Sequence, residues 1–558
     1  MMAEPPRIQL ANTISSRDST LLKDALLWNY GASKNTDGRI FAIPRFGVQL
    51  ASAIPAMTAG AALGFFAFGT HLLAIVGSTF YVDGVSQGTV DSTSPYQFTL
   101  TGAGGTGVFL KNSAKAYTWN GTTLAQVTDA NYPAVTVPGV AYMDGYVFVE
   151  DPAGNIWNSN LNTPATWNAL NSIVASSSAD PGAAISRLYN YVIGFGQFSI
   201  GFFQDAGNTP PGSPLLPNLS AAANVGCACG TSVVATENTI FWIAQTHQKG
   251  RSVYMMNGLV PTPISDERVD RVLNADPLTN VFAFFIKTNG HAYYVLTLTA
   301  SNVTLVYDVT MGLWSRWSST ALGSKSMNAV VSYLNGTTVT VVIPNHGLQS
   351  GAVINVSSPN TSQSFLGTYV PTIIDANTIS YTVGQQMVGG INTDTINTTD
   401  INADTVLNSA AGLGQLVVTP YVQNVFAQVM YAYANNTDYL LGQSDGKVYS
   451  MLESVSSDNG AFIYGLLRTN AGDFGSDNTK FCQRIEVIGD KIADTAYVGY
   501  SDDDFNTWSA FRPVNLGAAR AMLRRAGAFR RRAFALLYIG GFQVRFYQLE
   551  LGIEEGDQ

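Results

Sequence analysis

One pattern constrains the fold of this chain more than any other: a β-hairpin that recurs along most of its length. Each unit is an apolar strand, a polar or glycine turn, and a second strand with an aromatic residue. The units are His71–Gly84, Asp144–Asn158, Tyr189–Phe203, Glu237–Gly258, Ala292–Asp308 and Asp438–Leu452. The first strands that begin at residues 146, 191, 239 and 292 are separated by 45, 48 and 53 residues. A period near 50 with four strands per period predicts an all-β fold, a β-propeller of roughly six blades. An array of β-sandwiches with accidental spacing is the alternative.

The gap from Ala292 to Tyr439 is too long for one blade and predicts an insertion. The strand-like stretches between Val339 and Thr419 indicate a small β-domain, which an exposed loop tolerates at little entropic cost. We therefore expect an extended or helical segment at 1–40, the first part of the propeller at 41–335 and the inserted β-domain at 336–419. Residues 420–558 are expected to complete the propeller and to form a C-terminal β platform.

Helical signals are confined to Ser19–Leu27 and Asp266–Leu273. The segment Gln49–Val82 has no charged residue and is long enough to cross a bilayer. Glycine turns at Gly69–Thr70 and Gly77–Ser78 divide it into strand-length pieces, so buried strands are favoured over a transmembrane helix. No stable membrane insertion is expected.

Charge is scarce, because Asp, Glu, Lys and Arg make up 12% of the chain, about half of the usual share. An uncharged surface suits a protein that neighbours cover. The net charge of −9 argues against electrostatic binding of nucleic acid by the chain as a whole. Three cysteines give no disulfide framework, and the first residues show no secretory signal.

Motifs for catalysis or for cofactors are weak. Gly102–Gly107 fits G-x-G-x-x-G, but a strand pattern follows where a dinucleotide site needs a helix, so a glycine-rich hairpin is favoured. Neither the four histidines nor Cys227 and Cys229 have the spacing of a zinc site. The pentads of Ile391–Thr405 match no calcium loop and are read as a polar tip. We expect no enzymatic activity, no cofactor and no metal.

A turn near the C-terminus resembles the Asp-box of sialidases and other propellers. Its residues are Ser501, Asp503, Thr507 and Trp508, and Phe505 stands where the box has glycine. Side-chain oxygens in such a turn hydrogen-bond its backbone while the tryptophan packs, so the expected role is structural.

Arginines concentrate just beyond this turn and alternate with apolar residues. The candidates for an interface or a DNA-facing surface are Arg520, Arg524, Arg525, Arg530, Arg531 and Arg532. Such a run can be a solvated face, a contact with an acidic neighbouring subunit, or a contact with phosphate backbone. The acidic chain favours the subunit contact.

Several stretches, in this order, resemble the tail hub or nozzle proteins of short-tailed bacteriophages (podoviruses), also called packaged-DNA stabilisation proteins. They are Pro44–Val48, Asp144–Val149, Ser159–Leu170, Gly226–Gln245, Asn257–Leu273, His291–Leu298, Leu305–Ser319, Tyr439–Leu452, Ser501–Ser509 and Leu523–Phe534. The predicted insert resembles a small β-module of many phage virion proteins through His346–Val356, Phe365–Val370 and Asn377–Val383.

The resemblance implies a structural virion protein that is made in the host cytoplasm and placed in the tail. Its expected partners are copies of itself in a ring, most often a hexamer, the portal and adaptor rings, and tail fibres or spikes. Double-stranded DNA is expected to pass through the ring without sequence specificity. The alternative is a tail-associated propeller protein that binds or hydrolyses glycans.

Overall fold

In the computed structural model the chain divides into two compact units. Unit 1 comprises Met1–Val48, Leu313–Phe426 and Glu453–Gln558, and unit 2 comprises Gln49–Gly312 and Ala427–Leu452. The structure describes residues 7–10, 26–175, 180–248, 250–319, 327–328, 331–335, 337–343, 354–357, 367–375, 377–382, 405–406, 417–420 and 425–556. Structural statements below refer to these residues.

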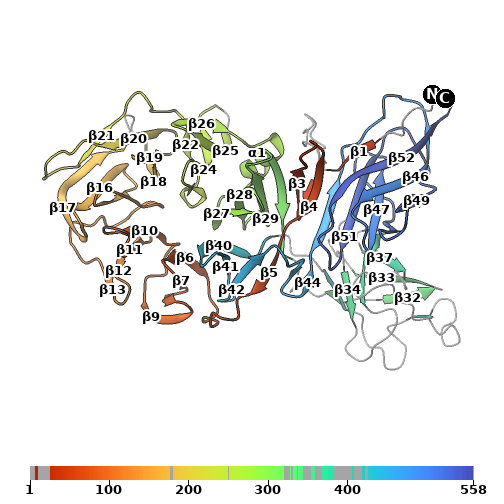
Figure 1. Ribbon diagram of the computed structural model, residues 1–558, viewed down its shortest axis with the longest axis horizontal. Helices are drawn as coiled ribbons and strands as arrows, with labels where there is room; N and C mark the ends of the chain where they lie inside the picture. Colours follow the sequence, from red (N-terminus) through yellow and green to blue (C-terminus); the bar gives the residue numbers. More distant parts are fainter. Residues whose placement is uncertain are drawn as a thin grey trace. The chain divides into compact units, whose positions relative to one another are not determined.

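Unit 2 contains seven sets of antiparallel strands, numbered as blades 1 to 7, of which the last two are parts of larger sheets (Figure 1). Blades 1 and 2 are β6 (Ala62–Phe68), β7 (His71–Val76), β8 (Thr79–Val82) and β9 (Val85–Thr89), then β10 (Gln97–Thr101), β11 (Gly107–Lys111), β12 (Ala116–Trp119) and β13 (Leu124–Gln126). Blades 3 and 4 are β14 (Ala141–Met143), β15 (Tyr146–Glu150), β16 (Asn155–Asn160) and β17 (Thr163–Val174), then β18 (Gly182–Leu188), β19 (Tyr191–Gly196), β20 (Ile200–Asp205) and β21 (Leu215–Pro217). Blade 5 is β22 (Gly226–Cys227), β23 (Val234–Ala235), β24 (Ile240–Thr246), β25 (Gly250–Asn257) and β26 (Val260–Pro263). Blade 6 has β27 (Val281–Thr288), β28 (His291–Leu298) and β29 (Val303–Asp308), and blade 7 has β40 (Gln428–Ala434), β41 (Thr437–Gly442) and β42 (Val448–Leu452).

The blades close into a ring although blade 7 lies far from the others in sequence. The inner strands touch in the order β6, β10, β14, β18, β23, β27 and β40, and β40 returns to β6. The late strands β40–β42 therefore close the circle between blade 6 and blade 1 (Figure 1). This arrangement is a β-propeller, and the predicted all-β propeller fold is confirmed.

The six hairpins found in the sequence are the second and third strands of six blades. Blade 2, which consists of β10 to β13, was missed because its central hairpin, β11 and β12, was not among the repeat units. Its turn Gly102–Gly107 joins β10 to β11 and contains three glycines with positive φ, so the predicted glycine-rich hairpin is confirmed. The count of roughly six blades is thus corrected to seven.

The prediction of buried strands in Gln49–Val82 is also confirmed, by β6, β7 and β8. Among the described residues, no helix is long and apolar enough to cross a membrane. The helix predicted at Asp266–Leu273 is α1 (Glu267–Ala275), and the Asp266 carboxylate accepts the backbone N–H of Val269 as its N-cap. A short 3-10 helix, η1, spans Gly230–Ser232.

The other predicted helix, Ser19–Leu27, has a different outcome. Its residues 19–25 lie outside the described part of the chain, and its last two residues belong to strand β2 (Leu26–Trp28). Pairing of β2 with β45 decides this local structure, since three residues have little intrinsic preference of their own.

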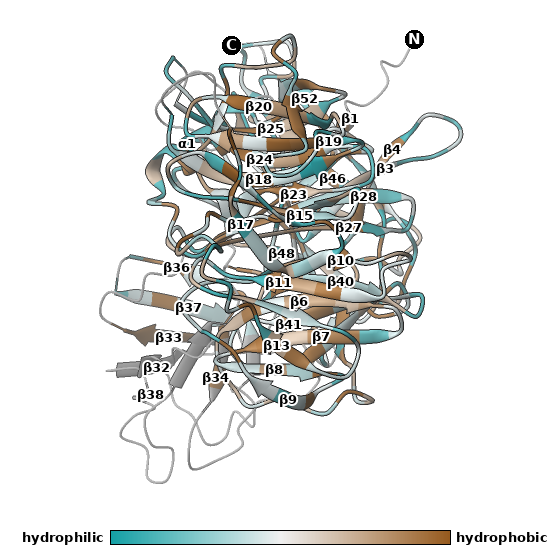
Figure 2. Cartoon of the chain, turned by 90° about the vertical axis from the view of Figure 1, so that its left-hand side faces the viewer, coloured by the Kyte–Doolittle hydropathy of each residue, from teal (hydrophilic) through white to brown (hydrophobic). Residues whose placement is uncertain are grey.

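The core of unit 2 lies between neighbouring blades. Leu73 and Phe80 of blade 1 pack with Leu110 and Trp119 of blade 2, and the same kind of cluster joins blades 2 to 3, 3 to 4 and 4 to 5. Met57, Leu72 and Tyr81 pack with Val429 and Leu441 where the ring closes. Figure 2 shows the hydrophobic stretches in strands such as β24. Each blade is therefore stabilised by its neighbours.

Unit 1 is built from strands that are distant in sequence. One sheet contains β1 (Arg7–Gln9), β3 (Tyr30–Lys34), β4 (Ile40–Pro44), β46 (Lys480–Gly489), β49 (Met522–Arg524), β50 (Ala528–Phe529) and β52 (Phe546–Glu555). In a second sheet, neighbouring strands pair in the order β30 (Leu313–Trp317), β2, β45 (Tyr464–Arg468), β51 (Ala533–Ile539), β47 (Thr495–Ser501) and β48 (Arg512–Asn515). Strand β5 (Gly47–Leu50) begins in this unit and pairs there with β43 (Ser457–Asp458), which pairs with β44 (Ala461–Phe462).

Two small sheets occupy the region of the predicted insert. One consists of β31 (Met327–Asn328), β39 (Val417–Pro420), β34 (Ile354–Ser357) and β35 (Gly367–Tyr369). The other consists of β36 (Thr372–Ile373), β37 (Thr378–Thr382), β33 (Thr338–Val342), β32 (Val331–Asn335) and β38 (Thr405–Val406). The chain boundaries of an inserted domain at 336–419 stay a prediction.

Candidate functional site

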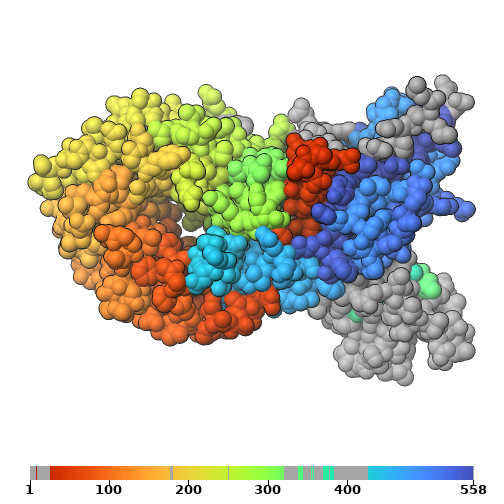
Figure 3. Space-filling model, viewed as in Figure 1, coloured from red at the N-terminus to blue at the C-terminus, as the bar shows by residue number. Residues whose placement is uncertain are grey.

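The centre of the propeller holds a cavity of about 800 Å³. It is lined from all seven blades, because the inner strands converge on the axis; the hollow is visible in unit 2 in Figure 3. The lining includes Phe65 and Phe66 of β6, Gln97 and Phe98 of β10, Val140 just before β14, Ser186 of β18, Val234 of β23, Phe282 and Phe284 of β27, and Tyr431 of β40.

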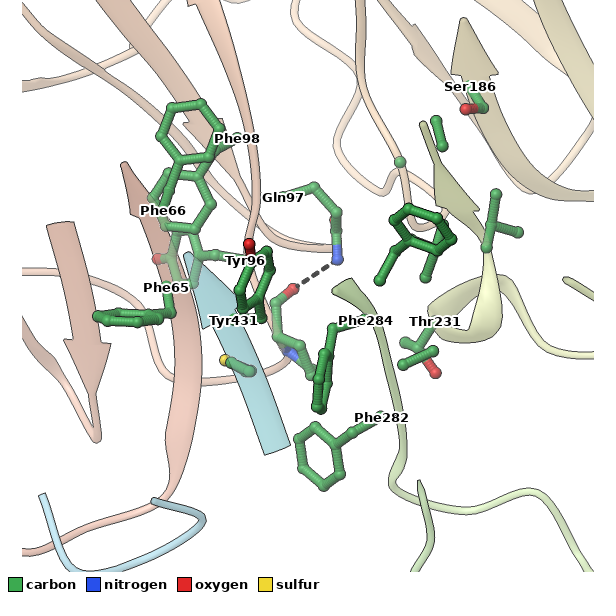
Figure 4. Close-up of a pocket in the computed structure, with 18 of the residues that line it drawn as sticks. Phe65, Phe66, Tyr96, Gln97, Phe98, Ser186, Thr231, Phe282, Phe284 and Tyr431 are labelled. Atoms are coloured by element: carbon green, nitrogen blue, oxygen red, sulfur yellow. Dashed lines mark hydrogen bonds between the residues drawn. The ribbon is translucent and has the colours of Figure 1, made fainter. Parts of the chain in front are cut away.

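Aromatic rings dominate the wall of this cavity (Figure 4). Phe66 and Phe98 are stacked with ring centroids 5.3 Å apart, and Phe284 and Tyr431 are stacked at 6.0 Å. Burial, followed by a hydrogen bond from its hydroxyl to Asp438, raises the pKa of Tyr431, so this side chain stays a neutral phenol. The wall offers aromatic contacts to an occupant.

The charged residues among those that line the cavity are Glu237 and Lys287, whose side chains are largely exposed and form an ion pair of 3.5 Å. This pair belongs to a solvated edge, where such contacts contribute little. Among the lining residues that the structure describes, no hydroxyl is hydrogen-bonded to a buried base.

The arginine segment lies in unit 1, and the structure divides its six candidates into two groups. Arg532 is 1% exposed, and its guanidinium donates to both oxygens of Asp502, at 2.6 and 2.7 Å. The same group lies over the rings of Tyr500 and Phe529, 3.9 and 4.3 Å from their centroids. Arg532 is therefore packed inside its own unit, and its role as an interface or DNA-facing residue stays a prediction.

Two further arginines have partners within the chain but stay partly exposed. Arg520 donates to both oxygens of Glu486, and this hydrogen bonding is the largest influence that lowers the pKa of Glu486. Arg531 lies 3.3 Å from Asp504. A surface contact with another molecule has to compete with these existing pairs.

The side chains of Arg524, Arg525 and Arg530 are exposed. Arg525 has a φ of 57°, and the carbonyl groups of Arg524 and Arg525 accept hydrogen bonds from Arg512 at 2.8 and 3.0 Å. These bonds fix the backbone of the turn and leave the guanidinium groups of Arg524 and Arg525 to face outward. These three arginines are the candidates that the structure leaves for an interface.

The Asp-box-like turn follows strand β47. The Asp503 carboxylate accepts the backbone N–H and the hydroxyl of Thr507, and the Ser501 hydroxyl accepts the N–H of Phe505 at 2.9 Å. Phe505 adopts a φ of 71° in place of the glycine of the box. Trp508 packs near Phe505 and under the guanidinium of Arg468 at 5.0 Å. The turn chemistry of the box is thus present without its glycine.

The structure also shows the surroundings of the cysteines and of one histidine that the sequence analysis considered. Cys227 is buried, and burial raises the pKa of the Cys229 thiol, which disfavours a reactive thiolate. His291 pairs with Asp308 at 2.7 Å inside blade 6. The described residues contain no group of three or more side chains that could hold a metal. The pentads of 391–405 lie almost wholly outside the described residues.

Sequence reasoning missed a buried ionisable pair between blades 2 and 3. Lys111 is fully buried and donates to the Thr136 hydroxyl at 2.9 Å and to the carbonyl of Val137. Burial lowers its pKa to about 7, and burial raises the pKa of the neighbouring Glu150. Lys111 and Glu150 lie in strands with apolar neighbours, so no motif marks them.

The stretch Pro44–Val48 contributes a second buried charge, in unit 1. The Arg45 guanidinium bonds both oxygens of Asp458 and donates to the side-chain oxygen of Asn29 at 2.9 Å and to the Ser318 carbonyl at 2.7 Å. The β3–β4 hairpin region and two segments distant from it in sequence, around Ser318 and Asp458, meet at this residue. The stretch that helped to carry the resemblance is therefore a structural anchor.

Comparison with known proteins agrees with this structural character. The family model described as bacteriophage P22 Gp10, beta-propeller, matches residues 47–342, which is more than half of the chain. The chain belongs to this family. It is accordingly a structural, tail-associated bacteriophage protein and a component of the virion.

Two further comparisons add no argument about function. A search of curated proteins gives no match. Among solved structures, the crystal structure of the N-terminal domain of Nup159 aligns with a TM-score of 0.32 and 8% identity. The alignment covers 76% of this chain and 98% of that chain.

Proposed function

We propose that this protein forms the ring-shaped hub or nozzle of a short phage tail, below the portal and adaptor. In this role it closes the channel that holds the packaged DNA and lets the DNA pass during ejection. The observation that carries the proposal is the family match over residues 47–342, together with the order of the resembling stretches on both sides of it.

The charge distribution supports a conduit and an assembled ring. A chain with a net charge of −9 does not hold DNA through released counterions, so DNA can slide past it. The small share of charged residues favours wide contacts with neighbouring subunits, since interface cores are depleted of charge. A six-membered ring is the assembly that we propose.

The exposed arginines Arg524, Arg525 and Arg530 are proposed to contact carboxylates of a neighbouring subunit or of the adaptor. Tail fibres or spikes are further proposed partners, for which no docking residue is assigned.

The ring is tested by native mass measurement and particle averaging of purified tails. We expect a six-fold species that contains this chain; a stable trimer within the particle contradicts the proposal. Reversal of Arg524, Arg525 and Arg530 to Glu is expected to block assembly while the isolated chain stays folded. If tails assemble but lose DNA increasingly with salt, the arginines contact phosphate instead.

A further inference from the structure

A second cavity of about 930 Å³ opens in unit 2 where blades 4 and 5 meet. It is lined by the turn between β19 and β20, the turn between β24 and β25, and the connections that precede β18 and β22. The lining of this cavity includes Asp180, Gln197, Phe198, Asn224, His247 and Gln248. We call this cavity the blade 4–5 pocket.

Close backbone approaches build one wall of the pocket. A Cβ atom on Gly226 would lie 2.2 Å from the carbonyl carbon of Gln197, so only glycine allows β22 to approach the turn at 197–199. Asp180 holds the same turn, because its carboxylate accepts the N–H of Phe198 at 2.8 Å and the hydroxyl of Ser199 at 2.9 Å. The turn is thereby fixed before any ligand arrives, which lowers the entropic cost of binding.

An aromatic surface joins the two blades at this pocket. The Phe198 ring from blade 4 and the His247 ring from blade 5 are stacked with centroids 3.9 Å apart and planes 16° apart. Tyr254 of β25 adds a third ring to the lining. Because Phe198 and His247 each cover one face of the other ring, their outward faces are the ones left to pack against the C–H face of a pyranose.

The polar groups of the lining are amides and hydroxyls with one carboxylate. Gln197, Asn224 and Gln248 each present both hydrogen-bond donors and acceptors, which neighbouring sugar hydroxyls can satisfy in pairs. Among the lining residues that the structure describes, Asp180 is the one charged side chain, so these residues present amides and hydroxyls rather than cations to a ligand. The lining has too few aliphatic side chains for an acyl chain.

We propose that the blade 4–5 pocket binds a neutral oligosaccharide of hexose or N-acetylhexosamine units. Its volume lies in the range of small-ligand sites and suits about two or three sugar units. The lining of this site shares no residue with the central cavity, and the proposal does not rest on ring assembly. A lack of glycan binding would leave the hub proposal untouched.

The test is saturation-transfer NMR on the full chain with four neutral trisaccharides: maltotriose, isomaltotriose, mannotriose and N,N′,N″-triacetylchitotriose. myo-Inositol hexakisphosphate serves as the anionic comparison. We expect at least one trisaccharide to bind more tightly than about 10 mM and more tightly than the phosphate compound.

Two substitutions on the exposed turn locate the site. His247→Ala and Gln248→Ala are each expected to weaken that binding by about fivefold or more, since each removes a ring or hydrogen-bond contact. Ser78→Ala is the matched control, because Ser78 is exposed in the corresponding turn of blade 1. Failure of all four trisaccharides to bind, stronger binding of the phosphate compound, or unchanged binding in both variants overturns the proposal.

Discussion

Replacement of Arg532 by Met tests whether the arginine segment contains a structural residue. The substitution removes two charge-assisted hydrogen bonds to Asp502 and the cationic contacts with Tyr500 and Phe529. Arg530→Met is the matched control, because Arg530 is two residues away and exposed.

The expected loss follows from what remains after the substitution. Breaking a buried pair costs about 3–5 kcal/mol when the remaining charge stays buried. The side chain of Asp502 is 39% exposed and can regain water. We therefore expect the free energy of unfolding to fall by about 3 kcal/mol, the lower end of this range. Arg530→Met should change the free energy of unfolding by less than about 0.5 kcal/mol.

Urea unfolding followed by tryptophan emission measures both variants. With a slope of about 3 kcal/mol per molar urea, Arg532→Met should lower the midpoint of the affected transition by about 1 M. The urea midpoint of Arg532→Lys should lie between those of Arg532→Met and Arg530→Met, since lysine keeps the charge but lacks the planar geometry of the guanidinium. Equal midpoints for Arg532→Met and Arg530→Met would refute the structural role.

Three further predictions concern residues with defined surroundings. Arg45→Met should destabilise unit 1 by about 3–5 kcal/mol in urea unfolding, whereas the exposed Arg39→Met should be nearly neutral; similar midpoints would contradict the anchor role. Because the pKa of Glu150 is raised in the folded state, the contribution of Glu150 to stability should fall as pH rises above about 4.5. Between pH 5 and 6, the free energy of unfolding of Glu150→Gln should therefore rise relative to that of wild type by at most about 1.4 kcal/mol. Parallel pH profiles of thermal midpoints would argue against that shift. Asp503→Ala should lower the free energy of unfolding by about 1 kcal/mol, because the hydrogen bonds of its carboxylate in the turn are lost, and Asp504→Ala should lower it less. The opposite order in urea unfolding would exclude the box geometry.

Local signals in the sequence were sufficient for many elements of the fold. Alternation and glycine turns gave β6, β7 and β8, because a two-residue turn and a period of two are written in neighbouring residues. The helical signal at Asp266–Leu273 likewise gave α1. The same kind of reasoning placed the hydrogen bonds of the turn at Ser501–Trp508.

Blade count and ring closure needed the tertiary structure. Blade 2 was missed because its central strands do not match the other repeat units in sequence. Blade 7 could be recognised as a hairpin, but its position between blades 6 and 1 depends on contacts between β40, β27 and β6, which are long-range.

The sequence by itself determined many of the strands and turns and the family, because each depends on residues that are close together in the chain. It also located the arginines, but it could not tell that Arg532 is buried and Arg530 exposed. That difference arises from Asp502, Tyr500 and Phe529, which reach Arg532 only after the sheets of unit 1 have formed. The blade 4–5 pocket likewise exists only where turns of two blades meet. Tertiary structure decided these features because burial and proximity across a sheet are properties of the folded chain, and side-chain chemistry changes when water is removed.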